Sequence, residues 1–276
     1  MTNSPEHLRQ YEAEGYLIAD DVVEPDMLGA LLEAAKRVKK MVRSGEVDVF
    51  THWASRGEPW AIRGLFAPEF AEPVFAEYLV SRPVLAYAHA FLSQELRLGG
   101  VTLFTNPYHA DYSFGWHRDL GAKPLDTSHE EELATLSQPM RGLRWHLALV
   151  PDHCLMIVPW SHRRCLTPFE RECLLQSPHE PIPGQTVIEL HAGQTVFWNG
   201  NLIHRGMMRS DVERLTLAGS WRKHSPDDPA EKTDPRLRWM LAGNVRAALP
   251  DAMRPCYDRW RALQDRHQTG AESVGV

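Results

Sequence analysis

Two histidines and one aspartate are the residues of this chain best placed to hold a metal ion. His117 and Asp119 stand two positions apart in the run GWHRD, and side chains at i and i+2 of a strand face the same side. A third ligand must come from elsewhere, and His204 follows a short apolar run and a glycine turn 87 residues later. Two histidines and one carboxylate form the facial triad of non-haem Fe(II) oxygenases, which leaves coordination positions open for a cosubstrate and O₂. The separation fits two strands that are adjacent in a barrel.

An arginine ten residues past His204 indicates how a cosubstrate is held. Arg214 begins the run RLTLA, and a guanidinium inside a β core needs an anion because an unpaired buried charge is costly. Its planar fork suits a carboxylate, and Thr216 on the same strand face offers a hydroxyl to the same group. A dicarboxylate that chelates iron at one end and meets Arg214 at the other has the shape of 2-oxoglutarate. Taken alone, Arg214 could instead pair with Asp211 or Glu213 at the surface.

Two further residues are candidates for the cosubstrate pocket, each with a structural alternative. Trp145 could line the pocket, or it could be a plain core aromatic. Asn106 stands just before Pro107 and could reach the cosubstrate or cap a turn. Of the other histidines, we expect His146 to be a core or pocket residue and His162 to be a hydrogen-bonded turn residue outside the metal site.

Composition restricts the chain to the ordinary globular proteins. Its 276 residues are 43% hydrophobic and 24% charged, which excludes disorder as the main description. A formal net charge of −6 argues against a protein that binds nucleic acid by neutralising phosphates. No apolar run is long enough for a transmembrane helix, and the polar N-terminus shows no signal peptide. The four cysteines form no CxxC pair, so we expect reduced thiols, a cytoplasmic location and neither a membrane nor a nucleic-acid partner.

Short apolar runs separated by Pro, Gly and Asn fill the middle of the chain and are typical of strands. We expect strands at 100–104, 143–150, 155–158, 186–190, 195–198 and 214–218. Helical spacing marks 6–14, a long segment from Pro25 to Val42, 83–96 and 233–265, with a brief strand at 16–18. The expected architecture is a single domain over 1–276, mainly β, with a sandwich or barrel core at about 98–222 and helical flanks at both ends.

The segment between the first long helix and the next helical pattern has no period. Residues 46–68 contain Gly, Pro, Trp and polar residues, and we interpret them as an irregular connection. With Trp53, Trp60 and Arg63 it is a candidate lid over the site.

Beyond these residues, the sequence resembles the phytanoyl-CoA dioxygenase family of Fe(II)/2-oxoglutarate-dependent oxygenases. The matching pieces are YEAEGYLI at 11–18, WHRD at 116–119, LMIVPWSH at 155–162, AGQTVF at 192–197, His204 and Arg214. The resemblance implies a double-stranded β-helix, which is a jelly-roll core of the cupin-like type with flanking helices. It further implies that His117, Asp119 and His204 are the iron ligands and that Arg214 anchors 2-oxoglutarate.

Four residues at three sites depart from the family's pattern. Trp160 replaces the glycine of the usual Pro-Gly-Ser-His turn, Asp152-His153 replaces Asn-Gly, and Gly206 stands where a serine is common. These departures concern the substrate and the fine geometry of the cosubstrate, and they leave the ligand set intact. The presence of Asp119 disfavours the halogenase branch, which lacks this carboxylate.

The resemblance implies an enzyme that hydroxylates a C–H bond of a small organic substrate. Fe(II), 2-oxoglutarate and O₂ would be the cofactor and cosubstrates, with succinate and CO₂ as co-products. Two alternatives stay open, a cupin-like metal-dependent isomerase or hydrolase that uses no 2-oxoglutarate, and a non-catalytic ligand-binding jelly roll. Succinate release coupled to O₂ uptake distinguishes the dioxygenase from the first, and the intact triad argues against the second.

Overall fold

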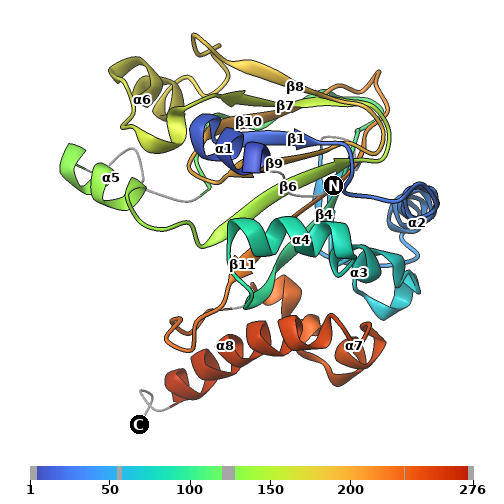
Figure 1. The fold of residues 1–276 in the computed structure, drawn as a ribbon. Helices are drawn as coiled ribbons and strands as arrows, with labels where there is room; N and C mark the ends of the chain where they lie inside the picture. The colour runs from blue at the N-terminus through green and yellow to red at the C-terminus, as the bar shows by residue number, and fades with distance from the viewer. Residues whose placement is uncertain (1–4, 55–57, 120–127, 233, 273–276) are drawn as a thin grey trace.

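The computed structural model of the chain describes residues 5–54, 58–119, 128–232 and 234–272 (Figure 1). Within these ranges every strand pairing is antiparallel. The strands are β1 (Tyr16–Ala19), β2 (Thr51–Trp53), β3 (Pro59–Arg63), β4 (Leu96–Thr105), β5 (Tyr112–Ser113), β6 (Gly142–Ala148), β7 (Asp152–Val158), β8 (Thr186–Leu190), β9 (Thr195–Asn199), β10 (Ile203–Met208) and β11 (Leu215–Lys223).

The strands form two sheets that pack face to face. The larger sheet has the order β1-β9-β6-β11-β4-β3-β2, and the smaller has the order β5-β10-β7-β8. Between them, Val196 and Trp198 of β9 join Leu155 and Ile157 of β7 in one apolar cluster. The chain crosses from one sheet to the other between β6 and β7, β8 and β9, and β9 and β10. These crossings are typical of a jelly roll, and the expected double-stranded β-helix is confirmed.

Strand register divides the side chains of the larger sheet between two faces. Directly paired residues share a face, so Leu147, Leu217 and Leu103 on β6, β11 and β4 point together into the main core. The alternate row, with His146 and Ala218, points toward the smaller sheet. The apolar outer face of the larger sheet must therefore be covered by other elements, whereas its inner face lines a cavity.

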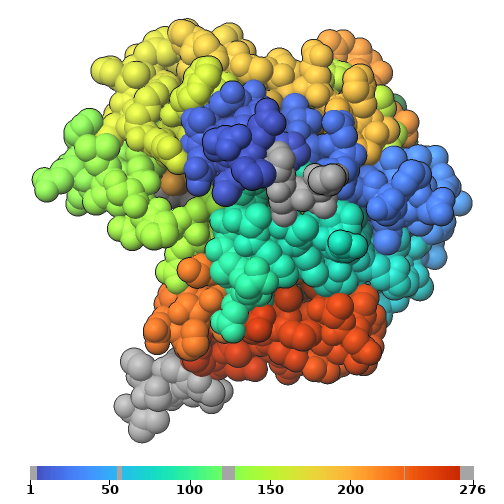
Figure 2. Space-filling model, viewed as in Figure 1, coloured from blue at the N-terminus to red at the C-terminus, as the bar shows by residue number. Residues whose placement is uncertain are grey.

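Helices provide that cover on the outer face of the larger sheet (Figure 1). Tyr78 of α3 (Val74–Leu79) contacts Trp145, and Tyr87 of α4 (Arg82–Phe91) stacks on Phe197. The C-terminal helix α8 (Arg254–Glu272) packs along β4. Figure 2 shows the orange and red C-terminal segment as an outer layer beside the teal segment that holds α3 and α4.

Other helices surround the two sheets. They are α1 (Pro5–Glu14), α2 (Pro25–Ser44), η1 (Pro68–Phe70), α5 (His129–Leu136), η2 (Ser161–Arg163), α6 (Pro168–Leu175), η3 (Pro235–Leu241) and α7 (Gly243–Ala248). In α2 the buried residues Leu31, Ala35 and Val38 recur at helical spacing. This helix ends at Gly45, whose φ of 73° is left-handed and favours glycine.

Several expectations about elements are wrong. Residues 46–68 are not an irregular connection, because β2 and β3 in this segment extend the edge of the larger sheet. The helix expected at 83–96 ends at Phe91, and β4 begins at Leu96. The short strand β5 and the helices α5 and α6 were not expected. A strand at His204 was expected only from its separation from His117, since polar residues interrupt the apolar pattern of β10, which reads IHRGMM.

Within the described ranges, no helix combines the length and the apolar character needed to cross a membrane. All four cysteines are free thiols, as expected. Cys154, Cys173 and Cys256 are buried, which is typical of cysteine used as a small apolar residue.

Candidate metal centre

The segment that carries His117 and Asp119 lies beside β10 as an extended chain. The backbone N–H of His117 donates to the carbonyl of His204 at 3.0 Å, and the His204 N–H donates to the His117 carbonyl at the same distance. The Asp119 N–H donates to the carbonyl of Gly200 at 2.9 Å. The pairing is a single bridge, so the expectation of a regular strand around His117 is wrong. The expected adjacency of the two segments is nevertheless present.

The three side chains expected to bind iron meet at one point. One ligand atom from each of His117, Asp119 and His204 lies within 4.8 Å of the other two. The Asp119 carboxylate is 3.5 Å from Nε2 of His117 and 3.6 Å from Nε2 of His204. The His204 side chain is buried, whereas His117 and Asp119 are partly open to the cavity between the sheets. An ion held here would have ligands on one side and open positions on the other.

Hydrogen bonds to the other ring nitrogens orient both imidazoles for a metal. Nδ1 of His117 donates to the carbonyl of Gly115 at 2.8 Å, and Nδ1 of His204 donates to the carbonyl of Leu202 at 2.9 Å. Since a carbonyl only accepts, each Nδ1 carries the proton and each Nε2 presents its lone pair to the centre. The donor set of two nitrogens and one carboxylate, already fixed in tautomer, therefore fits a divalent transition metal.

Electrostatics keep the ligands in the protonation states that a metal requires. Burial, and then the neighbouring His117, lower the pKa of His204 to about 4, so the ring is neutral at pH 7. Burial favours protonation of Asp119, but His204, His117 and the guanidinium of Arg144 together hold the pKa of this carboxyl below its ordinary value. Nε of Arg144 lies 2.9 Å from the Asp119 carboxylate. Asp119 is thus a carboxylate beside a neutral His204 imidazole over the neutral pH range.

Arg214 is buried at one end of the cavity and already faces a carboxylate of the protein. Its Nε donates to Asp152 at 3.1 Å, and both side chains are at most 4% exposed. The hydroxyl of Thr216 donates to the same carboxylate oxygen, and the backbone N–H of Cys154 donates to the other at 2.7 Å. Burial opposes ionisation of Asp152, but Arg214 and Thr216 hold its pKa below the ordinary value. Asp152, rather than a surface acid, is therefore the protein partner of Arg214.

The two further cosubstrate candidates lie away from the cavity. Asn106 is buried behind Arg214, where its Oδ1 accepts from the Arg214 backbone N–H at 3.1 Å and from Nζ of Lys39 at 3.0 Å. Trp145 lies on the outer face of the larger sheet and packs against Tyr78 in the main core. The structure corrects the expectation of a pocket residue at Trp145, because strand alternation turns it away from its neighbour His146.

The cavity between the sheets has a volume of about 270 Å³. The three residues of the candidate metal centre, Arg214 and His146 line it, together with Trp60 and Arg63 of the segment considered as a lid. Trp53 of that segment is instead exposed, and residues 55–57 lie outside the described ranges. The lid role stays a prediction. His162 is buried and bonds through Nε2 to the carbonyl of Glu12, apart from the metal centre as expected.

Two residues of the centre were missed from the sequence as site residues. Arg144 stands two positions before His146, so strand alternation could have placed both on the cavity face. Asp152 was noted only as a departure from a family motif. Its position at the head of an apolar strand was a usable signal, because a carboxylate buried there needs a cation. Arg205 also borders the cavity, but its guanidinium turns away and stacks on Trp116 at 4.5 Å.

Comparison with known proteins gives a family and a fold. The family described as Phytanoyl-CoA dioxygenase (PhyH) matches residues 11–215. No curated protein matches the chain.

Among solved structures, EctD from S. alaskensis with 2-oxoglutarate and 5-hydroxyectoine has 21% identity and a TM-score of 0.63, covering 91% of this chain and 86% of its own. AviO1 from Streptomyces viridochromogenes has 17% identity and a TM-score of 0.60, and the match covers 83% of this chain and 98% of AviO1. HygX from Streptomyces hygroscopicus with nickel and 2-oxoglutarate bound has 16% identity and a TM-score of 0.59, and the match covers 89% of this chain and 94% of HygX. At these identities the similarity shows the fold alone.

Proposed function

Because the chain belongs to the phytanoyl-CoA dioxygenase family of non-haem iron and 2-oxoglutarate-dependent oxygenases, we propose that it hydroxylates a C–H bond of a small organic substrate. Succinate and CO₂ would be the co-products. The observation that carries the proposal is the convergence of His117, Asp119 and His204 within 4.8 Å, with both Nδ1 atoms bonded to backbone carbonyls so that both Nε2 atoms face the centre.

Each part of the cavity has a role in this reaction. His117, Asp119 and His204 would hold Fe(II), which when bound supplies the activation of O₂ together with 2-oxoglutarate. Arg214 would bind the remote carboxylate of 2-oxoglutarate, with Asp152 holding its Nε so that the terminal nitrogens stay available. We also propose Thr216 as a contributor at this end, through the same carboxylate.

The walls of the cavity would exclude water and place the substrate. The ring centres of Trp198 and His204 are 5.8 Å apart, and those of Phe114 and His117 are 4.8 Å apart. Aromatic side chains therefore flank both imidazoles. Ligand pockets commonly measure roughly 300–1,000 Å³. The 270 Å³ volume therefore favours a metabolite-sized substrate over a polymer.

An anaerobic titration with Fe(II) and 2-oxoglutarate tests the cofactor assignment before any substrate is known. We expect the wild type to develop the visible absorption band of the chelate, and His204→Ala to lose it because the buried nitrogen ligand is gone. His153→Ala is the matched control, since His153 is exposed and away from the centre, and it should keep the band.

A second measurement separates the dioxygenase from the other function classes. In air, the loaded wild type should release succinate in step with O₂ uptake, and a substrate screen should raise that rate. A protein that binds metal but gives neither the band nor succinate would contradict the proposal and favour a metal-dependent isomerase or hydrolase.

A further inference from the structure

Arg63 is a cation at the rim of the cavity that contacts no acid among the described residues. Arg144 lies 2.9 Å from the Asp119 carboxylate, and Arg214 lies 3.1 Å from Asp152. The side chain of Arg63, by contrast, makes neither an ion pair nor a hydrogen bond with any residue that the structure describes. Its guanidinium lies over the Phe50 ring, 5.4 Å from the ring centre, and Asp234 and Asp119 act on its charge only at longer range. Because Arg63 is exposed, a ligand at the mouth of the cavity can reach its charge.

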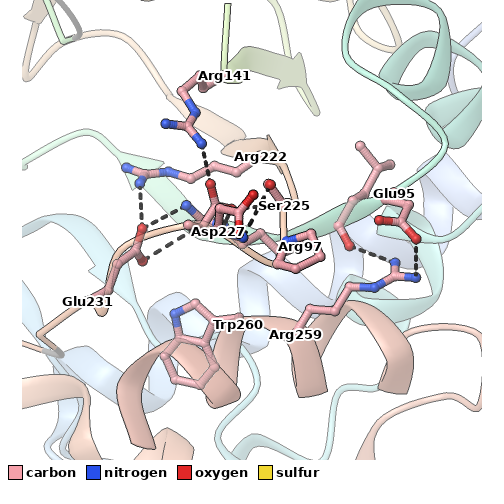
Figure 3. A network of polar contacts seen from close by, with 12 residues as sticks. Glu95, Arg97, Arg141, Arg222, Ser225, Asp227, Glu231, Arg259 and Trp260 are labelled. Carbon is pink, nitrogen blue, oxygen red and sulfur yellow. Dashed lines mark hydrogen bonds and ion pairs between the residues drawn. The ribbon is translucent and has the colours of Figure 1, made fainter. Parts of the chain in front are cut away.

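Other arginines of the same sheet show how the fold treats charges that no ligand reaches. Arg222 and Arg97 pair across β11 and β4, one row beyond the cavity floor. Both guanidiniums bind the Glu231 carboxylate (Figure 3), that of Arg222 at 3.1 Å and that of Arg97 at 2.7 Å. Arg97 also contacts Asp228 at 3.4 Å. The C-terminal segment thus supplies carboxylates in direct contact with this pair, whereas its Asp234, which acts on Arg63 at longer range, is bonded to Arg236 at 2.6 Å.

The geometry between Arg63 and Arg144 leaves room for an anionic group. The two residues stand on β3 and β6 and border one cavity. Three strand spacings, or about 14 Å, separate their backbones. Near these two arginines, β4 and β11 present small side chains or none to the floor: Gly99, Gly100, Thr102, Ala218, Gly219 and Ser220. Phe104 of β4 also borders the cavity, at the end where Arg214 lies over its ring. The floor between Arg63 and Arg144 is therefore open beside the three residues of the candidate metal centre.

Charge balance points to the sign and number of charges on the occupant. Guanidiniums of Arg63, Arg144 and Arg214 face two carboxylates, those of Asp119 and Asp152. On the proposed function, Fe(II) adds two positive charges and 2-oxoglutarate adds two negative ones. Among these groups, the guanidinium of Arg63 is the one that has no carboxylate in contact with it.

We propose that the substrate carries a carboxylate, which Arg63 binds at the open side of the cavity with Arg144 as a second donor. This inference rests on the proposed function and adds the substrate class. Trp60 and Phe114, whose ring centres are 6.5 Å apart, border the cavity. An apolar or aromatic body would lie against them, and the bond to be oxidised would then face His117, which contacts Phe114.

Matched acids and amides test this charge preference directly. The wild type is loaded anaerobically with Fe(II) and 2-oxoglutarate and titrated calorimetrically with benzoate, 3-phenylpropanoate and their uncharged amides. A hydrogen bond to a charged group contributes about 1.5–3 kcal/mol, so we expect the acids to bind at least about tenfold more tightly than the amides. Arg63→Gln should remove most of that preference. Phenyl phosphate, in a separate arm, distinguishes a carboxylate site from a general oxyanion site.

Arg246→Gln is the matched control for loss of an arginine. Arg246 pairs with Asp258 at 2.7 Å and does not border the cavity, so this variant should keep the preference for acids. The chelate band is recorded for every variant first, and its absence in the wild type would overturn the proposed function together with this inference. If the band is present, four results would overturn the substrate class alone. Two concern the preference: amides that bind as tightly as the acids, or an Arg63→Gln variant that keeps the wild-type preference for acids. The other two are phenyl phosphate binding more tightly than the carboxylates, and no binding of any acid.

Discussion

At the scale of single residues, Asp152 is the side chain on which the burial of Arg214 depends. Asp152→Ala would leave a guanidinium in the interior without its carboxylate, and breaking a buried pair in this way costs about 3–5 kcal/mol. We expect the free energy of unfolding, measured by urea titration, to fall by that amount. The Cys154 N–H would also lose its acceptor, which adds to the loss.

An exposed ion pair of the same type is the control for this prediction. Asp211 binds Arg209 at 2.6 Å with both side chains more than half exposed. Since surface pairs contribute roughly 0–1 kcal/mol, Asp211→Ala should change stability little. Equal losses in the two variants would show that Arg214 does not need Asp152.

Residue spacing predicted which three side chains converge as candidate metal ligands but not the groups that surround them. His117, Asp119 and His204 belong to types that bind metal directly, so their spacing carried chemical meaning. Arg144 and Asp152 act through contacts with other side chains, at 2.9 and 3.1 Å, and these contacts depend on register between strands distant in sequence. That register is a tertiary property, which one sequence does not reveal.

At the scale of elements, β11 depends on a glycine for its close packing. A Cβ on Gly219 would lie 2.5 Å from the Trp145 ring and 2.6 Å from the Gly100 carbonyl. Because one of these neighbours is backbone, Gly219→Ala should cost about 1–3 kcal/mol of unfolding free energy, as overpacking does. Gly206→Ala is the matched control, since its Cβ would meet nothing within 4 Å. A Gly219→Ala protein as stable as this control would contradict the packing.

Element types were easier to predict than their boundaries and their faces. Runs such as TVIEL and TVFWN became β8 and β9 because β-branched and aromatic residues dominate them. The edge pair β2 and β3 was missed, since Pro59 and the short length weaken a strand pattern. Alternation indicated that Trp145 and His146 face opposite sides, but only the helices packed on the sheet decide which side is the core.

At the scale of the whole molecule, stability depends on pH through buried histidine. Burial, with Arg214 as a further cause, lowers the pKa of His146 from 6.5 to about 3. Below pH 6.5, His146 is protonated in the unfolded chain but stays neutral in the folded chain. The free energy of unfolding therefore decreases as the pH falls toward 3. The loss from this one residue amounts to about 3 kcal/mol between pH 6.5 and 4. Asp152 adds a loss in the same direction below about pH 4, since its folded pKa is lowered.

His146→Phe tests this dependence because it keeps a flat ring between Phe104 and Trp198 and removes the titrating group. Urea titrations from pH 7 to 4 should show a shallower fall in stability than in the wild type. His153→Phe, at an exposed position, should follow the wild-type curve. Parallel curves for all three proteins would show that His146 does not titrate as described.

The single backbone bridge between His117 and His204 has a consequence for substitutions at the centre. Its two hydrogen bonds join the segments through main-chain atoms alone, and the imidazoles are oriented by carbonyls of their own segments. A substitution of either imidazole would therefore remove a candidate ligand and leave intact the main-chain bonds that hold the two segments side by side. Lost activity in such a variant would then report on the missing side chain and not on separated segments.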